Sequence, residues 1–318
     1  MLQRAVILFL LTAVLPLAAQ QENMRVMVER ADVEAMYAQA KATLEDTSIP
    51  NVESVPNLLE QCTLHGYAPA ARLLLDVYEG RFKGLEAKPV PACELAEKIA
   101  ETPLPDPDDP DCIQLQKEAL FRLALYKERG YGCTADPQQA FIYMYKAAEK
   151  GYGEARVQLA RYLMTGKMCK PNPALAWELL KRQANKDPRT PHVFFYMGYM
   201  CYKGVGHSSN PRKAADFFHL GAKMNDADCM NNLAAMYESG IAVKRDAGTA
   251  LTLYRKAAAL GNKRASANMQ RLAFKEGRRA DRDTGHSAGR RISNALLHVV
   301  KALPLSDAHK KTLRYHLN

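Results

Sequence analysis

The sequence predicts an all-α fold, a solenoid of antiparallel helix pairs, and three regularities carry this prediction. An alanine follows each of four regularly spaced glycines at the tenth position, and an Asp or Asn follows each glycine at the sixth. The glycines recur every 36 to 38 residues, at Gly130, Gly166, Gly204 and Gly240. Such an internal period is the signature of stacked repeats, each of which buries its apolar face against its neighbours.

Each repeat is predicted to contain two helices joined by a turn. The first helix ends at the glycine, because glycine readily adopts the left-handed conformation that closes a helix. The second helix begins at the Asp or Asn, because these side chains cap helix N-termini, and a proline follows them in three of the four copies. The predicted capping residues are Asp136, Asn172, Asn210 and Asp246.

This pattern resembles the Sel-one-like repeat, a variant of the tetratricopeptide repeat with a slightly longer turn. The matching stretches are residues 119–151, 193–222 and 229–261, for example LAAMYESGIAV followed by LYRKAAALG. The resemblance implies a right-handed α-solenoid that acts as a non-catalytic scaffold or adaptor for protein–protein interaction. It also implies that the first helix of each repeat lines a concave groove. A shared scaffold does not by itself define an activity.

The solenoid is predicted to span residues 24–277 as one elongated helical domain, followed by a linker at 278–291 and basic amphipathic helices at 292–318. Its approximate repeats are residues 31–66, 67–101, 114–151, 152–188, 189–225 and 226–261, with a half repeat at 262–277.

An acidic, proline-rich insertion occupies residues 101–111, ETPLPDPDDPD. Its prolines and aspartates predict an exposed, non-helical loop. A spacer is the simplest interpretation. A calcium site is the alternative, because Asp106, Asp108, Asp109 and Asp111 are close in sequence, although they lack the glycine turn of the common calcium-binding loop.

The N-terminal residues 1–19, MLQRAVILFLLTAVLPLAA, predict a secretory signal peptide that is cleaved after Ala19. A positive charge at Arg4 precedes an apolar run that ends at Pro16 and small residues. A membrane anchor is the alternative, but the run is shorter than the roughly 20 apolar residues that span a bilayer. We therefore expect a periplasmic or secreted chain, and among these the bacterial envelope.

The net charge of +10 is concentrated near the C-terminus, where residues 275–318 carry ten Lys or Arg against four Asp or Glu. Apolar residues at helical spacing between Ile292 and Leu303 predict an amphipathic helix. This helix would cap the last repeat. Alternatively, the basic tail would bind an anionic membrane surface or an acidic partner.

Disulfides are permitted in an exported chain, and this one has seven cysteines. The repeat register places six of them near two opposite edges of the solenoid, and pairs across those edges would be too far apart for a disulfide. Cys62–Cys112 and Cys93–Cys133 are the candidate pairs. Cys201 is predicted to be a buried thiol.

The sequence lacks familiar catalytic signatures. Its eight histidines have no spacing suited to a metal, no serine lies in a nucleophile elbow, and no glycine loop carries a phosphate-binding lysine. We therefore predict no catalytic residue, cofactor or metal. The alternative is an enzyme that binds or hydrolyses β-lactams, as some cysteine-rich relatives in the family are described to do, which a chromogenic β-lactam would test.

A row of tyrosines predicts the binding site. One stripe of each first helix is left free by the repeat, and in one copy it carries Tyr196, Tyr199 and Tyr202, with Arg161 and Arg122 in other copies. Tyr and Arg are enriched in binding hot spots. Packing of the tyrosines against a neighbouring helix is the alternative. The hypothesis is a groove centred on Tyr199 that binds a protein or peptide and not a nucleic acid.

Overall fold

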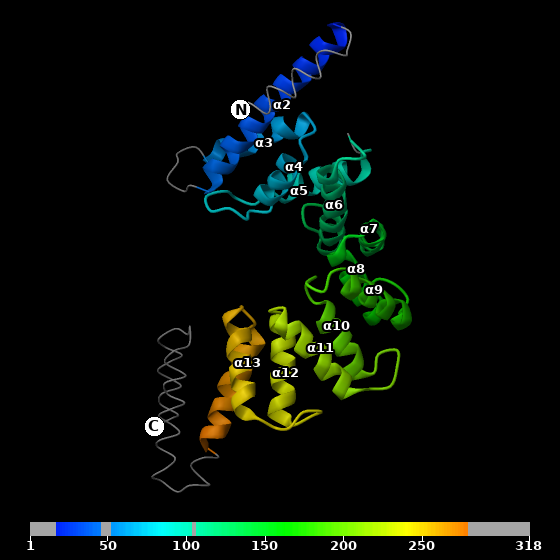
Figure 1. Cartoon of the computed structure of the whole chain (residues 1–318), viewed down its shortest axis with the longest axis vertical. Helices are drawn as coiled ribbons and strands as arrows, with labels where there is room; N and C mark the ends of the chain where they lie inside the picture. Colours follow the sequence, from blue (N-terminus) through cyan, green and yellow to red (C-terminus); the bar gives the residue numbers. More distant parts are fainter. Residues whose placement is uncertain (1–16, 46–51, 104–105, 279–318) are drawn as a thin grey trace. The chain divides into compact units, whose positions relative to one another are not determined.

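The computed structural model describes residues 17–45, 52–103 and 106–278, and within these ranges the chain forms helices, turns and loops without a β-strand (Figure 1). The predicted all-α fold is confirmed. The helices are α2 (Leu17–Glu45), α3 (Val55–Leu64), α4 (Ala68–Tyr78), α5 (Pro89–Glu101), α6 (Pro110–Arg129), α7 (Pro137–Glu149), α8 (Gly153–Thr165), α9 (Pro173–Lys186), α10 (Val193–Lys203), α11 (Pro211–Lys223), α12 (Ala227–Ser239) and α13 (Ala247–Ala259). The 3-10 helix η1 (Val52–Ser54) precedes α3, and another helix covers residues 263–278.

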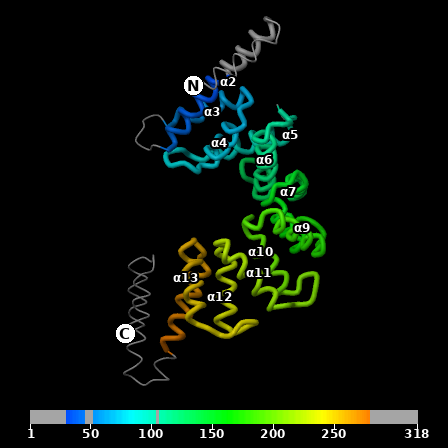
Figure 2. The backbone as a smooth tube through the Cα atoms, in the orientation of Figure 1, coloured from blue at the N-terminus to red at the C-terminus, as the bar shows by residue number. Residues whose placement is uncertain are grey.

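The chain divides into two compact units, Met1–Tyr152 and Gly153–Asn318. Within each unit, helices that are consecutive in the chain pack against each other (Figure 2). The division falls between α7 and α8, at a junction between repeats. The single elongated domain over residues 24–277 stays a prediction.

The predicted capping residues and glycines define the helix ends. Each capping side chain accepts a hydrogen bond from a backbone N–H in the first turn of α7, α9, α11 or α13. These residues are Asp136, Asn172, Asn210 and Asp246. The four glycines follow the first helices in the left-handed conformation, with φ of 70° at Gly130, 68° at Gly166, 72° at Gly204 and 74° at Gly240. Both predictions are confirmed.

The core is built from small residues that let paired helices approach. The alanines ten positions after each glycine are fully buried, namely Ala140, Ala176, Ala214 and Ala250. At Gly198 of α10, an added Cβ would lie 2.5 Å from Cε1 of Phe218 in α11. A side chain at this position would therefore force the two helices apart or displace the phenylalanine ring.

The acidic insertion is partly helical, which corrects the prediction of a loop over all of residues 101–111. Glu101 ends α5, and Pro110 begins α6, because proline is well tolerated in the first turn of a helix. Asp109 caps α6 by accepting a hydrogen bond from the N–H of Asp111 at 3.0 Å. Asp106 accepts one from the N–H of Asp108 at 3.0 Å. Among the residues that the structure describes, these aspartates do not form a convergent ligand cluster.

Several predicted segments fall outside the described residues. The first sixteen residues of the predicted signal peptide, most of the linker at 278–291 and all of 292–318 are among them. The predicted cleavage after Ala19 lies within α2, which begins at Leu17. In the ranges given above, every helix is too short or too polar to cross a membrane.

Candidate functional site

The predicted tyrosines lie on α10 in the second unit. Tyr199 is 38% exposed, and Tyr196 and Tyr202 are half-buried. The opposite face of α10 belongs to the core. Its buried residues are Val193, Phe194, Met197, Gly198, Met200 and Cys201. The helix also contacts α8 and α12, the first helices of the adjacent repeats. The three tyrosine side chains are therefore only partly buried in the core.

Four rings form an aromatic cluster along this face, made of His192, Phe195, Tyr196 and Tyr199. The Phe195 ring centroid lies 5.0 Å from that of Tyr196, 6.4 Å from that of Tyr199 and 6.1 Å from that of His192. Residues three and four apart share one face of a helix, which places both 195 and 196 beside 199. His192 precedes the helix as its N-cap residue, with a φ of 60°. We call this group the α10 aromatic cluster.

Sequence reasoning missed Phe195 and His192, although their spacing from Tyr199 was visible. The stripe chosen from the sequence followed a spacing of three residues only, whereas the rings of Phe195 and Tyr199 stack at a spacing of four, with an interplanar angle of 27°. Tyr202 lies outside the cluster, and the Nζ of Lys203 is 5.7 Å from its ring centroid.

Charges of both signs lie near Tyr196. Burial is the main cause that raises the pKa of its phenol, the cation of Arg161 opposes this shift, and the carboxylates of Asp228 and Asp226 add to it. The phenol is therefore neutral at physiological pH, with its hydroxyl able to donate a hydrogen bond. Arg161 of α8 thus acts electrostatically on one of the predicted tyrosines, Tyr196. Its Cζ lies 5.1 Å from the ring centroid of its own neighbour in the chain, Tyr162.

A cluster of titratable groups lies where α10 and α12 begin. Nδ1 of His192 is 3.5 Å from Oδ2 of Asp226 and 3.5 Å from Oδ2 of Asp228. The hydrogen bond with Asp226 is the main cause that raises the pKa of His192. Burial acts to raise the pKa of Asp226, but its bonds to His192 and to the N–H of Cys229 outweigh burial and lower it.

These three side chains also offer one nitrogen and two oxygen ligands within 4.8 Å of one another. The sequence predicted no metal site, because His192 is far along the chain from both aspartates. Their carboxylates already have structural roles. Asp226 accepts a hydrogen bond from the N–H of Cys229 at 2.9 Å, and Asp228 accepts one from Nδ2 of Asn262 at 2.8 Å. The group is therefore a helix-capping cluster with the donor types of a metal site.

Comparison with known proteins identifies the repeats. The family model of the Sel1 repeat matches residues 117–152, 153–187, 195–226 and 227–262. The chain therefore contains four Sel1 repeats. The α10 aromatic cluster accordingly begins in the loop before the third matched repeat and continues into it, and Arg161 lies in the second.

Solved structures share the Sel1 fold. A Sel1 repeat protein from Oxalobacter formigenes matches with a TM-score of 0.55 and 18% identity, over 85% of this chain and 99% of that one. The protective antigen c5321 of uropathogenic Escherichia coli, which displays an SLR fold, matches with a TM-score of 0.55 and 16% identity, over 90% of this chain and 63% of that one. At these identities the likeness concerns the fold.

A curated relative shares more sequence over a shorter region. The DAP3-binding cell death enhancer 1 of Rattus norvegicus is 30% identical, over 44% of this chain and 34% of that protein. The match thus spans about a third of the relative's length.

Arg122, in the first matched Sel1 repeat, is not placed to meet a partner. It is 6% exposed. Its Nη2 lies 2.6 Å from Oδ1 of Asp76 and 2.6 Å from Oε1 of Glu118, and its Nη1 lies 3.2 Å from Oε1 of Glu79. The prediction that Arg122 lines a binding surface is corrected, because three carboxylates of the first unit enclose its guanidinium.

All seven cysteines of this chain are free thiols in the structure. The Cys62 thiol donates to the carbonyl of Val33 at 3.6 Å, and the Cys112 thiol donates to Asp109 at 3.2 Å. The predicted Cys62–Cys112 disulfide is therefore not formed, because the two thiols face different partners.

The other candidate pair is adjacent. Burial, together with a hydrogen bond between the Cys93 and Cys133 thiols, raises the pKa of Cys93 to about 12. Cys93 is buried and Cys133 is half-buried. Cys201 is buried, as predicted.

Proposed function

We propose that this protein is a non-catalytic scaffold whose α10 aromatic cluster binds a peptide segment of a partner protein. Sel1 repeats generally act as protein–protein interaction modules, which gives the class of function. One observation supports the location. Four aromatic rings lie together along α10, and Tyr199 is exposed on the side opposite the buried core residues of this helix. Exposed aromatic groups of this kind are typical of interaction sites.

The charges around the cluster define the chemistry of the partner. Arg161 lies near Tyr196 on the side of α8, and Asp226 and Asp228 lie near it at the start of α12. A complementary segment carries an aromatic or aliphatic side chain for the rings, a carboxylate toward Arg161 and a cation or hydrogen-bond donor toward the aspartates. Such opposed charges would select the orientation of the bound segment.

Site-specific photocrosslinking tests this proposal. A photoreactive phenylalanine analogue placed at position 199 should form an adduct with the partner in cells that express the protein. The matched control is the same analogue at Tyr145, which is 46% exposed on α7. The partner recovered at 199 should bind the Tyr199→Ala protein at least about tenfold more weakly, as for a hot-spot residue. Equal adducts at both positions, or unchanged binding by Tyr199→Ala, would contradict the proposal.

We also propose that the chain is exported, on the strength of residues 1–19 alone. Protein isolated from its own cells should then begin at Gln20, the residue after the predicted cleavage site. Edman sequencing or mass spectrometry of the N-terminal peptide measures this directly. An intact N-terminus at Met1 would overturn this part of the proposal and would leave the binding function untouched.

A further inference from the structure

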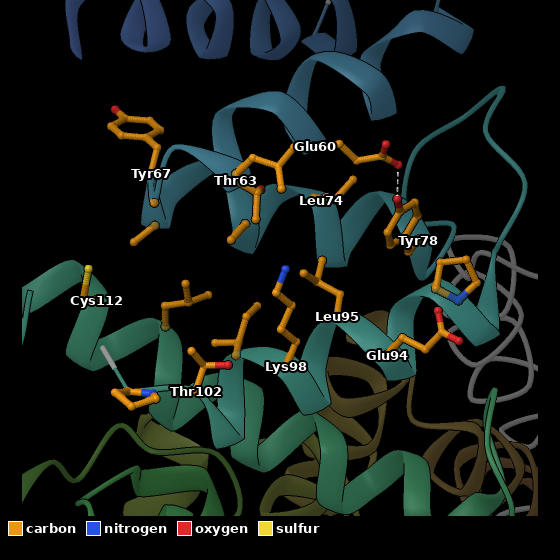
Figure 3. Close-up of a pocket in the computed structure, with 18 residues that line it drawn as sticks. Glu60, Thr63, Tyr67, Leu74, Tyr78, Glu94, Leu95, Lys98, Thr102 and Cys112 are labelled. Carbon is orange, nitrogen blue, oxygen red and sulfur yellow. Dashed lines mark hydrogen bonds between the residues drawn. The ribbon is translucent and has the colours of Figure 1, made fainter. Parts of the chain in front are cut away.

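A cavity of about 430 Å³ opens within the first unit, between α3 and α4 on one side and α5 on the other (Figure 3). Its walls are mainly apolar. They include Ala71 and Leu74 of α4, Leu95 and Ile99 of α5, and Leu115 of α6. Cavities of about 300 to 1,000 Å³ with apolar walls and few polar groups are typical of small-molecule sites. We call this space the α4–α5 cavity.

The connection between α4 and α5 explains why this helix pair stays open. It comprises residues 79–88, whereas the corresponding connections in the four later pairs comprise 130–136, 166–172, 204–210 and 240–246. Three additional residues let α5 stand away from α4, so the apolar side chains of the two helices line a space and do not fill it. In the α10–α11 pair, by contrast, Gly198 and Phe218 are in close contact.

One cation faces this space. Figure 3 shows the amino group of Lys98 pointing from α5 toward α3 and α4. Lys98 makes no ion pair with any residue that the structure describes. The nearby carboxylate of Glu60 accepts a hydrogen bond from the hydroxyl of Tyr78, and Thr63 donates its hydroxyl to the carbonyl of Leu59 at 2.7 Å. Glu60 and Glu94 are the carboxylates that line the cavity, and Lys98 is its cation, so an anionic group of a ligand is expected at Lys98.

We propose that the α4–α5 cavity binds a free fatty acid, with the acyl chain between α4 and α5 and the carboxylate at Nζ of Lys98. The size fits one chain. An apolar cavity of about 150 Å³ holds one benzene ring, so about 430 Å³ holds on the order of 17 non-hydrogen atoms. That is close to an acid of about 14 to 16 carbons and well below a two-chain lipid. A single ammonium group complements a single carboxylate.

Displacement of a fluorescent fatty acid tests the proposal on the full-length chain. Dansyl-undecanoic acid should bind with a saturable increase in fluorescence, and hexadecanoate should displace it. The Lys98→Met protein should bind hexadecanoate about tenfold more weakly, because the charged hydrogen bond is lost. Its affinity for hexadecanol should be unchanged, and Lys98→Arg should restore much of the affinity for the acid.

The matched control is Lys146→Met, because Lys146 lies three residues before the end of α7, as Lys98 does in α5. This variant should bind hexadecanoate as the wild type does. Circular dichroism should show unchanged helicity in both variants, because both side chains are exposed. Absence of binding by the wild type would overturn the proposal. So would an equal loss of acid and alcohol binding in Lys98→Met, or binding to phosphatidylglycerol vesicles without binding to free hexadecanoate.

Discussion

Nη2 of Arg122 in α6 lies 2.6 Å from Oδ1 of Asp76 in α4, and this contact links two helices that are not consecutive in the chain. Arg122 also lies close to Glu79 and Glu118. Three carboxylates thus surround one buried guanidinium. Since a buried charge without its partner is costly, this arginine should be important for the stability of the first unit.

We expect Arg122→Met to lower the free energy of unfolding by about 3 to 5 kcal/mol, because it removes the buried cation that Asp76, Glu79 and Glu118 share. Arg81→Met is the matched control. Arg81 pairs with Asp76 and Glu79 as well, but its side chain is 55% exposed, so its loss should cost less than about 1 kcal/mol. Urea denaturation followed by circular dichroism measures both. Similar losses for the two variants would show that burial is not the deciding factor.

Gly198→Ala should destabilise the second unit even though alanine favours helices. An added Cβ would lie 2.5 Å from Phe218, and overpacking of this kind costs about 1 to 3 kcal/mol. Gly248→Ala is the control. Its Cβ would meet only Oδ1 of Asp246, at 3.4 Å, so it should be neutral or slightly stabilising. Thermal unfolding of both variants gives the comparison, and a stabilising Gly198→Ala would contradict the packing found between α10 and α11.

The contact between His192 and Asp226 should make stability depend on pH. The folded-state pKa of His192 is raised above 6.5, so its contribution is complete below that value and is lost as the pH rises through the raised pKa. The pKa of Asp226 is lowered from 3.8, so its contribution is present above that value and is lost as the pH falls through the lowered pKa. The ion pair of His192 and Asp226 should therefore stabilise the folded state most between about pH 4 and 6.5.

His192→Asn tests this dependence, because asparagine tolerates the φ of 60° found at this position. The difference in unfolding free energy between wild type and variant should be larger at pH 5.5 than at pH 8.5. It should stay below about 1 kcal/mol, since the imidazole is 50% exposed. Denaturant titrations at the two pH values measure it. A difference that does not change with pH would show that the ion pair contributes nothing.

Cys93 and Cys133 should be the first cysteines to form a disulfide. An added thiol oxidant such as diamide would accept two electrons and two protons from the two thiols as they form the disulfide. The reaction should accelerate as the pH rises, because burial and the hydrogen bond to Cys133 raise the pKa of Cys93 and the thiolate is the reactive form. Peptide mapping by mass spectrometry identifies the linked pair. A Cys62–Cys112 link formed first would contradict the thiol contacts described above.

Much of the fold could be predicted from the sequence, because helix ends depend on the conformational preferences of a few neighbouring residues. Gly130 and Gly240 close helices because glycine tolerates positive φ, and Asp136 and Asp246 begin helices because their carboxylates bond nearby backbone N–H groups. These requirements act within a few residues, so their recurrence showed the repeats directly. The candidate site was partly predictable as well, because Tyr196 and Tyr199 are aromatic on a stripe that carries no aromatic residue in the other copies.

Contacts between distant residues could not be read in this way. Nothing in the sequence around Arg122 distinguishes it from a surface arginine. It is buried among carboxylates because α4 packs close to α6. His192 meets Asp226 because two loops converge at the starts of α10 and α12. The opening beside Lys98 depends on how far α5 stands from α4.

The amino-acid sequence by itself determined the helical repeats, their caps and the aromatic character of α10, because these depend on conformational preferences over one or two turns of helix. The tertiary structure alone decided which charged groups are buried, which thiols are adjacent and where a cavity remains. Those properties depend on the distances between packed helices, which side-chain volumes and connection lengths set jointly across the repeats.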